Sequence, residues 1–128
     1  MNVLLDTQAF LWWAVSSDRL TPSAAAAIAD PASRVLVSVA SAWEIAIKAS
    51  AGRLELAAPV ESYVPELLAR FGFEALAIDL AHALRAGSLP RHHGDPFDRM
   101  IVAQGQVEDM PIVTADPLIG LYDVETIW

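Results

Sequence analysis

Short apolar runs that are typical of buried strands alternate with helical patterns along the whole chain. Val3-Leu4-Leu5 and Val35-Leu36-Val37 have the length and aliphatic content of strands covered on both faces. The segments between such runs carry helix start signals, for example Thr21-Pro22 before the small residues Ser23 to Ala29. This alternation predicts right-handed crossovers and a mostly parallel sheet with helices on both faces.

The same pattern gives expected boundaries for the elements. We expect strands at residues 3–5, 35–37, 74–78 and 111–114, and an edge strand at 124–128. We expect helices at residues 9–15, 23–29, 41–51, 60–70, 79–86 and 95–107, and a short last helix from residue 116. A chain of 128 residues fits one core of ordinary size, so we predict a single domain over residues 1–128.

Composition narrows the classes of function. The chain has no cysteine, which excludes disulfides, thiolate catalysis and cysteine-ligated zinc. Its net charge of −8 argues against nucleic-acid binding driven by bulk charge, although divalent ions bound among the acids would weaken this objection. The first residues lack the basic region of a secretory signal, and no apolar run reaches the roughly 18 residues of a membrane span. We therefore expect a cytoplasmic protein.

Four acidic residues stand at or near the starts of predicted helices: Asp6, Glu44, Asp98 and Asp116. In an α/β fold the carboxyl ends of the strands meet at one edge of the sheet, so we expect these side chains to converge there. Like charges at such short distances need a cation among them to stay ionised, and Mg²⁺ and Mn²⁺ prefer oxygen ligands. The arrangement predicts a metal-dependent hydrolase.

Each acid also has an alternative explanation as part of a helix cap. Asp6 and Asp116 both directly precede helical segments. Ser41-x-x-Glu44 matches a capping box, and Asp95 with Asp98 fits the cap and third residue of another helix. Capping alone would be consistent with a catalytically silent protein-binding module. The two explanations are compatible, because the positive end of a helix dipole also stabilises a carboxylate that binds metal.

The histidines offer a second metal hypothesis, with His92, His93 and Asp95 of one loop as ligands. Adjacent histidines on a loop rarely point at one ion, and no later histidine supplies a third ligand at a usual spacing. His82 lies among small and apolar residues, where a surface or hydrogen-bonded core histidine is the simpler explanation. The chain has no glycine-rich phosphate loop and no GxSxG nucleophile motif.

Four segments resemble, in order and spacing, the PIN-domain ribonucleases of the VapC toxin type: LLDTQAFLWW, ASAWEIAIK, HHGDPFDRMIVAQG and PIVTADPLIGLYDVETIW. The resemblance spans nearly the whole chain and implies an α/β fold, a three-layer α/β/α sandwich around a mostly parallel sheet. It implies Mg²⁺- or Mn²⁺-dependent cleavage of RNA by the toxin of a type II toxin–antitoxin pair. It also implies a cognate antitoxin and a homodimer as partners. The family's catalytic and metal-binding acids fall on Asp6, Glu44, Asp98 and Asp116.

Polar residues near the four acids are candidates for supporting roles. Thr7 and Thr114 lie beside two of the acids, where a hydroxyl would position a carboxylate or contact a phosphate. The cations within a few turns of the acids are candidate phosphate contacts: Lys48, Arg53, Arg91 and Arg99. A metal-dependent phosphomonoesterase would use the same acids on a simpler phosphate ester, and it stands as an alternative to the ribonuclease.

Adjacent tryptophans in the first predicted helix suggest an association surface. Trp12 and Trp13 point about 100° apart on a helix, so one face of the core does not accommodate both. We expect one of them to lie outside the monomer core. The alternative is that both belong to the core.

Overall fold

A five-stranded parallel sheet forms the centre of the computed structural model, which describes all residues from 1 to 128. The strands are β1 (Asn2–Leu5), β2 (Arg34–Ser38), β3 (Glu74–Leu76), β4 (Ile112–Val113) and β5 (Thr126–Ile127). They lie in the order β3-β2-β1-β4-β5, and every adjacent pair is parallel. The parallel sheet predicted from the alternating pattern is confirmed.

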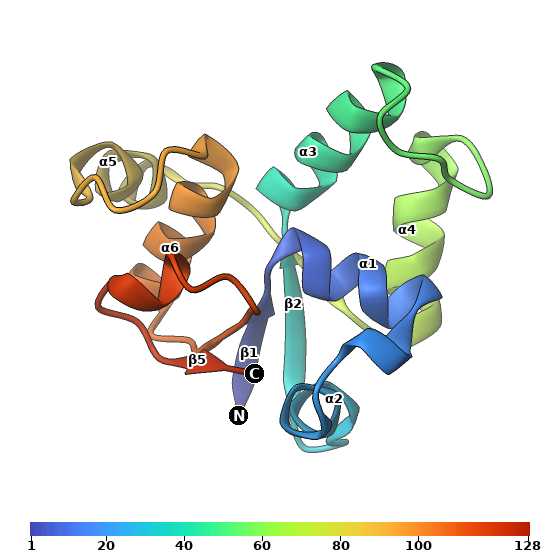
Figure 1. Cartoon of the computed structure of the whole chain (residues 1–128), viewed down its shortest axis with the longest axis horizontal. Coiled ribbons are helices and arrows are strands. Elements are labelled where there is room, and N and C mark those ends of the chain that lie inside the picture. The colour runs from blue at the N-terminus through green and yellow to red at the C-terminus, as the bar shows by residue number, and fades with distance from the viewer.

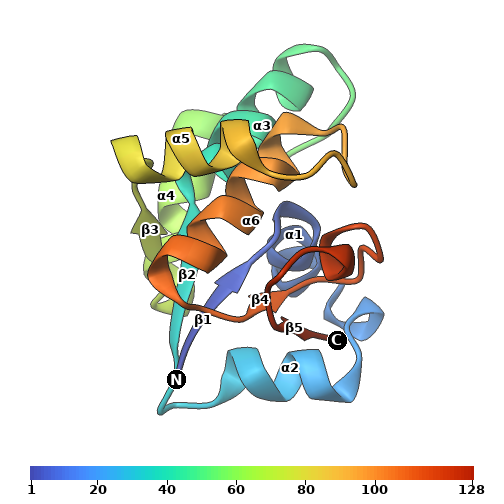
Figure 2. The ribbon, with the colours of Figure 1, turned by 90° about the vertical axis from the view of Figure 1, so that its left-hand side faces the viewer.

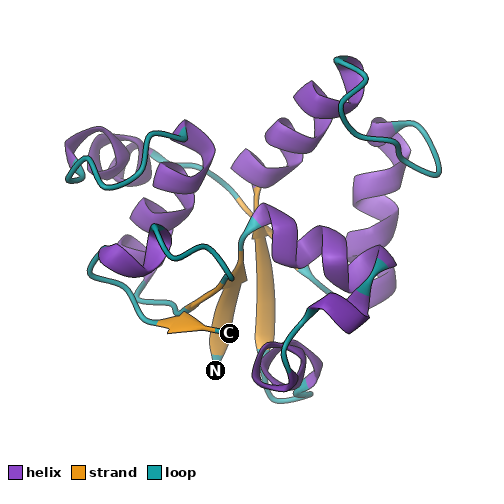
Figure 3. Cartoon of the chain, in the orientation of Figure 1, coloured by secondary structure: helices purple, strands orange, loops and turns teal.

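Helices cover both faces of this sheet. They are α1 (Thr7–Val15), α2 (Pro22–Ala29), α3 (Val39–Ser50), α4 (Val60–Phe71), α5 (Leu80–Ser88) and α6 (Pro96–Glu108), with short 3₁₀ turns η1 (Ser17–Arg19) and η2 (Ile119–Leu121). Helices α5 and α6 lie on one side of the strands, and α1, α2 and α4 lie on the other (Figure 1; Figure 3). The α/β/α sandwich is thus confirmed. None of the helices combines the length and apolar character needed to cross a membrane.

The side chains of the central strand divide the core into two layers. Val3 and Leu5 belong to the cluster that packs under α1 and α4, whereas Leu4 belongs to the cluster that packs under α6. All three side chains are fully buried. Since successive residues of a strand point to opposite faces, an unbroken apolar run is what a doubly covered strand requires.

The carboxyl ends of β1 and β2 lead directly into helices, which collects several helix starts at one edge of the sheet. Helix α1 follows β1 and α3 follows β2, and α3 extends beyond that edge in both views (Figure 1; Figure 2). Helix α2 lies near the amino ends of the strands, at the opposite edge (Figure 2).

Several expected boundaries are wrong. Helix α3 begins at Val39 and not at Ser41, because Ser38 at the end of β2 caps it by accepting a hydrogen bond from the Ala40 N–H at 3.0 Å. No regular helix opens at Asp116; the chain makes a turn there that leads into η2. Helix α5 does not end at the expected residue 86 and continues to Ser88. The strands β3, β4 and β5 are also shorter than expected.

The expectation that either Trp12 or Trp13 lies outside the core is wrong. Both are partly buried and pack against the α1–α4 side of the core. The Trp12 ring lies 5.8 Å from the ring of Trp128, and the Trp13 ring lies 6.3 Å from that of Phe71. The most exposed aromatic side chain is Trp43 of α3, which is 61% exposed.

Candidate active site

One cavity of about 490 Å³ at the carboxyl edge of the sheet is lined by all four acids of the predicted site. The acids come from four segments, since Asp6 follows β1, Glu44 lies on α3, Asp98 lies on α6, and Asp116 follows β4. The structure therefore brings together residues that lie up to 110 positions apart in the sequence. Lys48 and Arg53 line the same cavity.

Asp6 is held by hydrogen bonds to both of its carboxylate oxygens. Its Oδ1 accepts the Ala9 N–H at 2.7 Å, as expected for the cap of α1, and its Oδ2 accepts the Thr114 hydroxyl at 2.5 Å. The Thr114 oxygen in turn accepts the Asp116 N–H at 3.0 Å. Thr114 thus links two of the acids. The Thr7 hydroxyl donates to Ser41 Oγ at 2.8 Å.

Glu44 is not a helix cap, which removes the capping explanation for this acid. It lies in the second turn of α3 and is only 5% exposed. Lys48 Nζ donates to its Oε2 at 2.7 Å, while its Oε1 is buried and has no hydrogen-bond partner. A buried carboxylate oxygen without a partner is unfavourable. In a cavity shared with four other acids, such an atom points to a cation as its partner.

Asp95 serves as the cap of α6, so the neighbouring Asp98 is available for another role. Asp95 Oδ1 accepts the N–H groups of Phe97 and Asp98, at 2.8 and 3.3 Å. Asp116 Oδ1 accepts the Leu118 N–H at 2.9 Å within the turn that leads to η2, while its Oδ2 lies 2.8 Å from His93 Nε2 in the acid cluster. Hydrogen bonds to local backbone N–H groups therefore account for Asp95 Oδ1 and Asp116 Oδ1. They do not account for Asp116 Oδ2, which lies in the acid cluster.

Burial, with a smaller contribution from the neighbouring acids, raises the pKa values of Asp6 and Asp98. Burial raises the pKa of Asp6, although hydrogen bonds from Thr114 and Ala9 oppose this effect. Burial, followed by the negative charge of Asp95, raises the pKa of Asp98 to about 7. In both cases the other acids of the cavity add to the increase. Without a cation, the folded state thus disfavours the fully ionised cluster.

The raised pKa of Asp98 predicts how the stability of the metal-free protein depends on pH. Between about pH 4 and 7 the folded state binds a proton at Asp98 that the unfolded state, with a pKa near 3.8, has released, so stability falls as pH rises through this range. We expect Asp98→Asn to reduce this fall and to raise the melting temperature at pH 8 in EDTA. With solvent screening of the exposed part of the carboxylate, the gain is about 1–2 kcal/mol.

Thermal unfolding at pH 5.5 and pH 8 measures this difference between Asp98→Asn and the wild type. Asp123→Asn is a matched control, because Asp123 is exposed and lies outside the cavity. Equal pH dependence in Asp98→Asn and the wild type would contradict the prediction.

His93 joins the acid cluster, and His92 does not. His93 Nε2 lies 3.0 Å from Asp98 Oδ2 and 2.8 Å from Asp116 Oδ2. The ring of His92 instead packs edge-on against Tyr122, with centroids 5.0 Å apart. The hypothesis that His92, His93 and Asp95 form a separate metal site is therefore wrong. The sequence gives no signal that singles out His93 over its neighbour.

The prediction from the sequence that Arg99 contacts phosphate is wrong. Its guanidinium group donates to backbone carbonyl oxygens of the segment before α6, at Ala86, Leu89 and Pro90, with distances of 2.9 to 3.1 Å. It thus fixes that segment to α6. Lys48 and Arg53 remain suitable for phosphate because they line the cavity.

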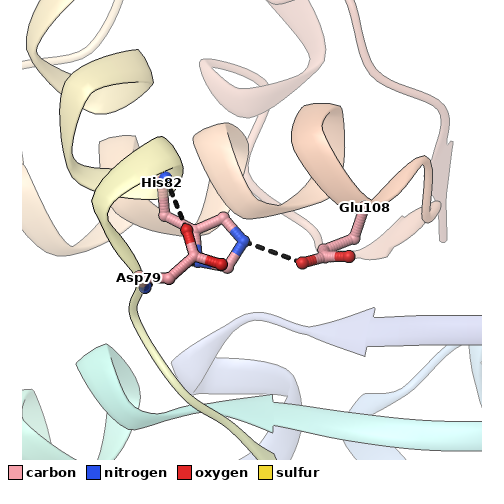
Figure 4. A group of neighbouring side chains, drawn as sticks. All are labelled: Asp79, His82 and Glu108. Atoms are coloured by element: carbon pink, nitrogen blue, oxygen red, sulfur yellow. Dashed lines mark hydrogen bonds and ion pairs between the residues drawn. The ribbon is translucent and has the colours of Figure 1, made fainter.

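A second group of possible metal ligands, Asp79, His82 and Glu108, is a structural link between α5 and α6 (Figure 4). His82 is 1% exposed, and its Nδ1 accepts the Asp79 N–H at 3.1 Å. Its Nε2 therefore carries the ring proton and donates to Glu108 Oε1 at 3.0 Å. Both ring nitrogens are used, so this histidine is a hydrogen-bonded core residue.

Comparison with known proteins decides the family. The model of the PIN domain family matches residues 3–124. The chain belongs to the PIN domain family. Ribonuclease VapC22 of Mycobacterium tuberculosis is 34% identical over 116 residues, which cover 90% of this chain and 87% of that protein. The resemblance to this family inferred from the four sequence segments is confirmed.

Solved structures of VapBC and toxin–antitoxin complexes share the fold. The structure of VapBC2 from Rickettsia felis, bound to a promoter DNA fragment, matches with a TM-score of 0.72 and 13% identity, over 98% of this chain and 97% of that one. A toxin–antitoxin complex from Klebsiella pneumoniae matches with a TM-score of 0.54 and 15% identity, over 89% and 86%.

The donor set of the cavity fits a hard divalent cation. PIN-domain ribonucleases depend on metal ions, and the four acids offer only oxygen atoms, which Mg²⁺ and Mn²⁺ prefer over softer ligands. The unpartnered Glu44 Oε1 and the mutual repulsion at Asp6 and Asp98 would both be relieved by positive charge in the cavity.

Proposed function

We propose that this PIN domain is a metal-dependent endoribonuclease and the toxin of a type II toxin–antitoxin pair. The observation that carries the proposal is the convergence of four carboxylates from four segments on one cavity that also contains Lys48 and Arg53. The named activity of VapC22, a ribonuclease that is similar over nearly its whole length, supports RNA as the substrate. Hydrolysis by activated water does not itself require the RNA 2′-hydroxyl, so the choice of RNA rests on that relative.

In this proposal, Asp6, Glu44, Asp98 and Asp116 hold Mg²⁺ or Mn²⁺. A bound divalent ion lowers the pKa of water and stabilises negative charge on the phosphoryl group and the leaving oxygen. The protein supplies the positions of the oxygens. Thr114 and the Ala9 N–H fix Asp6, and the α3 backbone carries Glu44 into the cavity.

Lys48 and Arg53, together with bound divalent ions, would answer the objection raised by the net charge of −8. Five carboxylates line the same cavity as these two cations, so a phosphate backbone would meet local positive charge there once the ions are bound. Lys48 is 39% exposed and pairs with Glu44 Oε2 at 2.7 Å. We assign these two residues to binding of the phosphates that flank the cleaved bond.

The partners of the proposal are an antitoxin and a second copy of the chain. The antitoxin is supported by the Klebsiella pneumoniae structure, which is a toxin–antitoxin complex. The homodimer is supported by apolar side chains that face solvent on α3: Val39, Trp43 and Ile47.

Cleavage assays on the partner-free protein test the proposed activity. We expect cleavage of single-stranded RNA in millimolar Mn²⁺, complete loss in EDTA, and recovery when Mn²⁺ is added back. A chromogenic phosphate monoester and single-stranded DNA serve as comparison substrates under the same conditions. Turnover of the monoester without RNA cleavage would indicate a phosphomonoesterase instead. No turnover of any substrate, with no Mn²⁺ binding, would indicate a protein-binding module.

A further inference from the structure

His93 is placed between two of the proposed metal-binding acids without being one of them. Its Nε2 approaches Asp116 Oδ2 at 2.8 Å and Asp98 Oδ2 at 3.0 Å, and the three atoms form one compact group. The imidazole is only 10% exposed. These two acids come from different segments, one from α6 and one after β4, so a single side chain bridges two walls of the cavity.

The hydrogen bond at His93 Nδ1 determines which ring nitrogen carries the proton. The Asp95 N–H donates to His93 Nδ1 at 3.1 Å, so Nδ1 acts as an acceptor and carries no proton. The ring proton therefore lies on Nε2 and is donated to Asp116 Oδ2, while Asp98 Oδ2 lies 3.0 Å from the same nitrogen. A metal ion at Nε2 would require the proton to move to Nδ1, which faces the Asp95 N–H. His93 is thus arranged to contact the carboxylates and not the metal.

The backbone of the loop that carries His93 is also held in place. The Tyr122 hydroxyl accepts the His93 N–H at 2.9 Å and donates to the Pro90 carbonyl at 2.8 Å. Arg99 donates to the same Pro90 carbonyl at 2.9 Å. The loop that carries His93 is therefore fixed to α6 and to the segment after β4, which are the two parts of the chain that supply the acids.

We infer that His93 is a positioning residue, whose Nε2–H holds Asp98 and Asp116 at the separation that a shared divalent ion requires. This inference rests on the proposed metal site. Groups that hydrogen-bond to metal ligands fix the orientation of those ligands, and their loss typically weakens metal binding 10- to 100-fold. We expect His93 to orient Asp116 Oδ2 in particular, since that oxygen accepts the Nε2 hydrogen bond, whereas Oδ1 is bound to the Leu118 N–H.

Two amide substitutions test the contribution of the Nε2 donor separately from that of the rest of the imidazole. In His93→Gln the amide nitrogen reaches about as far as Nε2, whereas in His93→Asn the shorter amide reaches only to the position of Nδ1. Binding of Mn²⁺ alone to the full chain, measured by titration calorimetry at one pH, is expected to weaken 10- to 100-fold in His93→Asn. It should stay within about threefold of the wild type in His93→Gln. His92→Asn is the matched control and should bind as the wild type does.

The possible results decide between this inference and the proposed function. Equal affinity in His93→Asn and the wild type would overturn the positioning role alone, as would tighter binding or an equal loss in both His93 variants. No binding of Mn²⁺ to the wild type would overturn the metal site itself. Should His93→Asn fail to fold, ¹⁵N chemical shifts of the wild-type imidazole give the answer. We expect the Nε2–H form with and without Mg²⁺; a change to Nδ1–H on adding Mg²⁺ would show that His93 is a ligand.

Discussion

Asp6→Asn is expected to lower Mn²⁺-dependent RNA cleavage by on the order of 10³-fold while the protein stays folded. Removing one group that stabilises charge in a transition state typically costs 10²- to 10³-fold, and here the metal affinity falls as well. The fold tolerates the change because the Asn oxygen still caps α1 at the Ala9 N–H. The neutral amide also removes the unfavourable burial that raises the pKa of Asp6, so the melting temperature in EDTA should not fall.

The matched control is Asp79→Asn, which makes the same change at a helix cap outside the cavity. Asp79 caps α5 by accepting the His82 N–H at 3.1 Å, in the same way that Asp6 caps α1. If the cavity acids were only caps, both variants would behave alike. Initial rates of RNA cleavage and thermal unfolding with and without Mn²⁺ provide the comparison. Full activity in Asp6→Asn from a nuclease-free preparation would refute the assignment of this acid.

The sequence was sufficient to predict the sheet and the position of two acids. An apolar run such as Val3-Leu4-Leu5 has to be covered on both faces, and parallel strands place their carboxyl ends at one edge. Asp6 and Asp116 each follow a strand closely, so their convergence at that edge requires only the strand order. The helix caps at Asp6 and Asp95 were equally predictable, because capping depends on residues two or three positions away.

Features that depend on contacts between distant segments could not be predicted in the same way. The Ser41-x-x-Glu44 spacing matched a capping box, but Ser38 starts α3 one turn earlier and places Glu44 inside the helix. The sequence does not distinguish His92 from His93. In the structure Tyr122 contacts both: its ring packs against His92, and its hydroxyl binds the His93 N–H, which leaves the His93 side chain at the acids. Whether an arginine is free to bind phosphate also depends on packing. The sequence does not show that backbone carbonyl oxygens occupy the Arg99 guanidinium group, so the prediction that Arg99 contacts phosphate was wrong.

Arg99→Met is expected to destabilise the protein by about 3 kcal/mol and to lower its melting temperature by roughly 10 °C. Its guanidinium group donates to the carbonyl oxygens of Ala86, Leu89 and Pro90, at 2.9 to 3.1 Å. Hydrogen bonds to a charged donor contribute about 1.5–3 kcal/mol each, and the carbonyls left without a donor add a desolvation cost. Methionine keeps the aliphatic packing of the side chain but supplies no donor.

Arg70→Met provides the control for loss of an arginine at the surface. The Arg70 side chain is 58% exposed and reaches Glu66 only at 3.4 Å, so its loss should change stability by less than about 0.5 kcal/mol. Thermal unfolding in EDTA measures both variants. Unchanged stability in Arg99→Met, with weaker binding of RNA, would restore Arg99 as a phosphate contact. If Arg99→Met instead loses stability and also binds Mn²⁺ more weakly, Arg99 influences the acids indirectly. It would do so by anchoring the loop that carries His93.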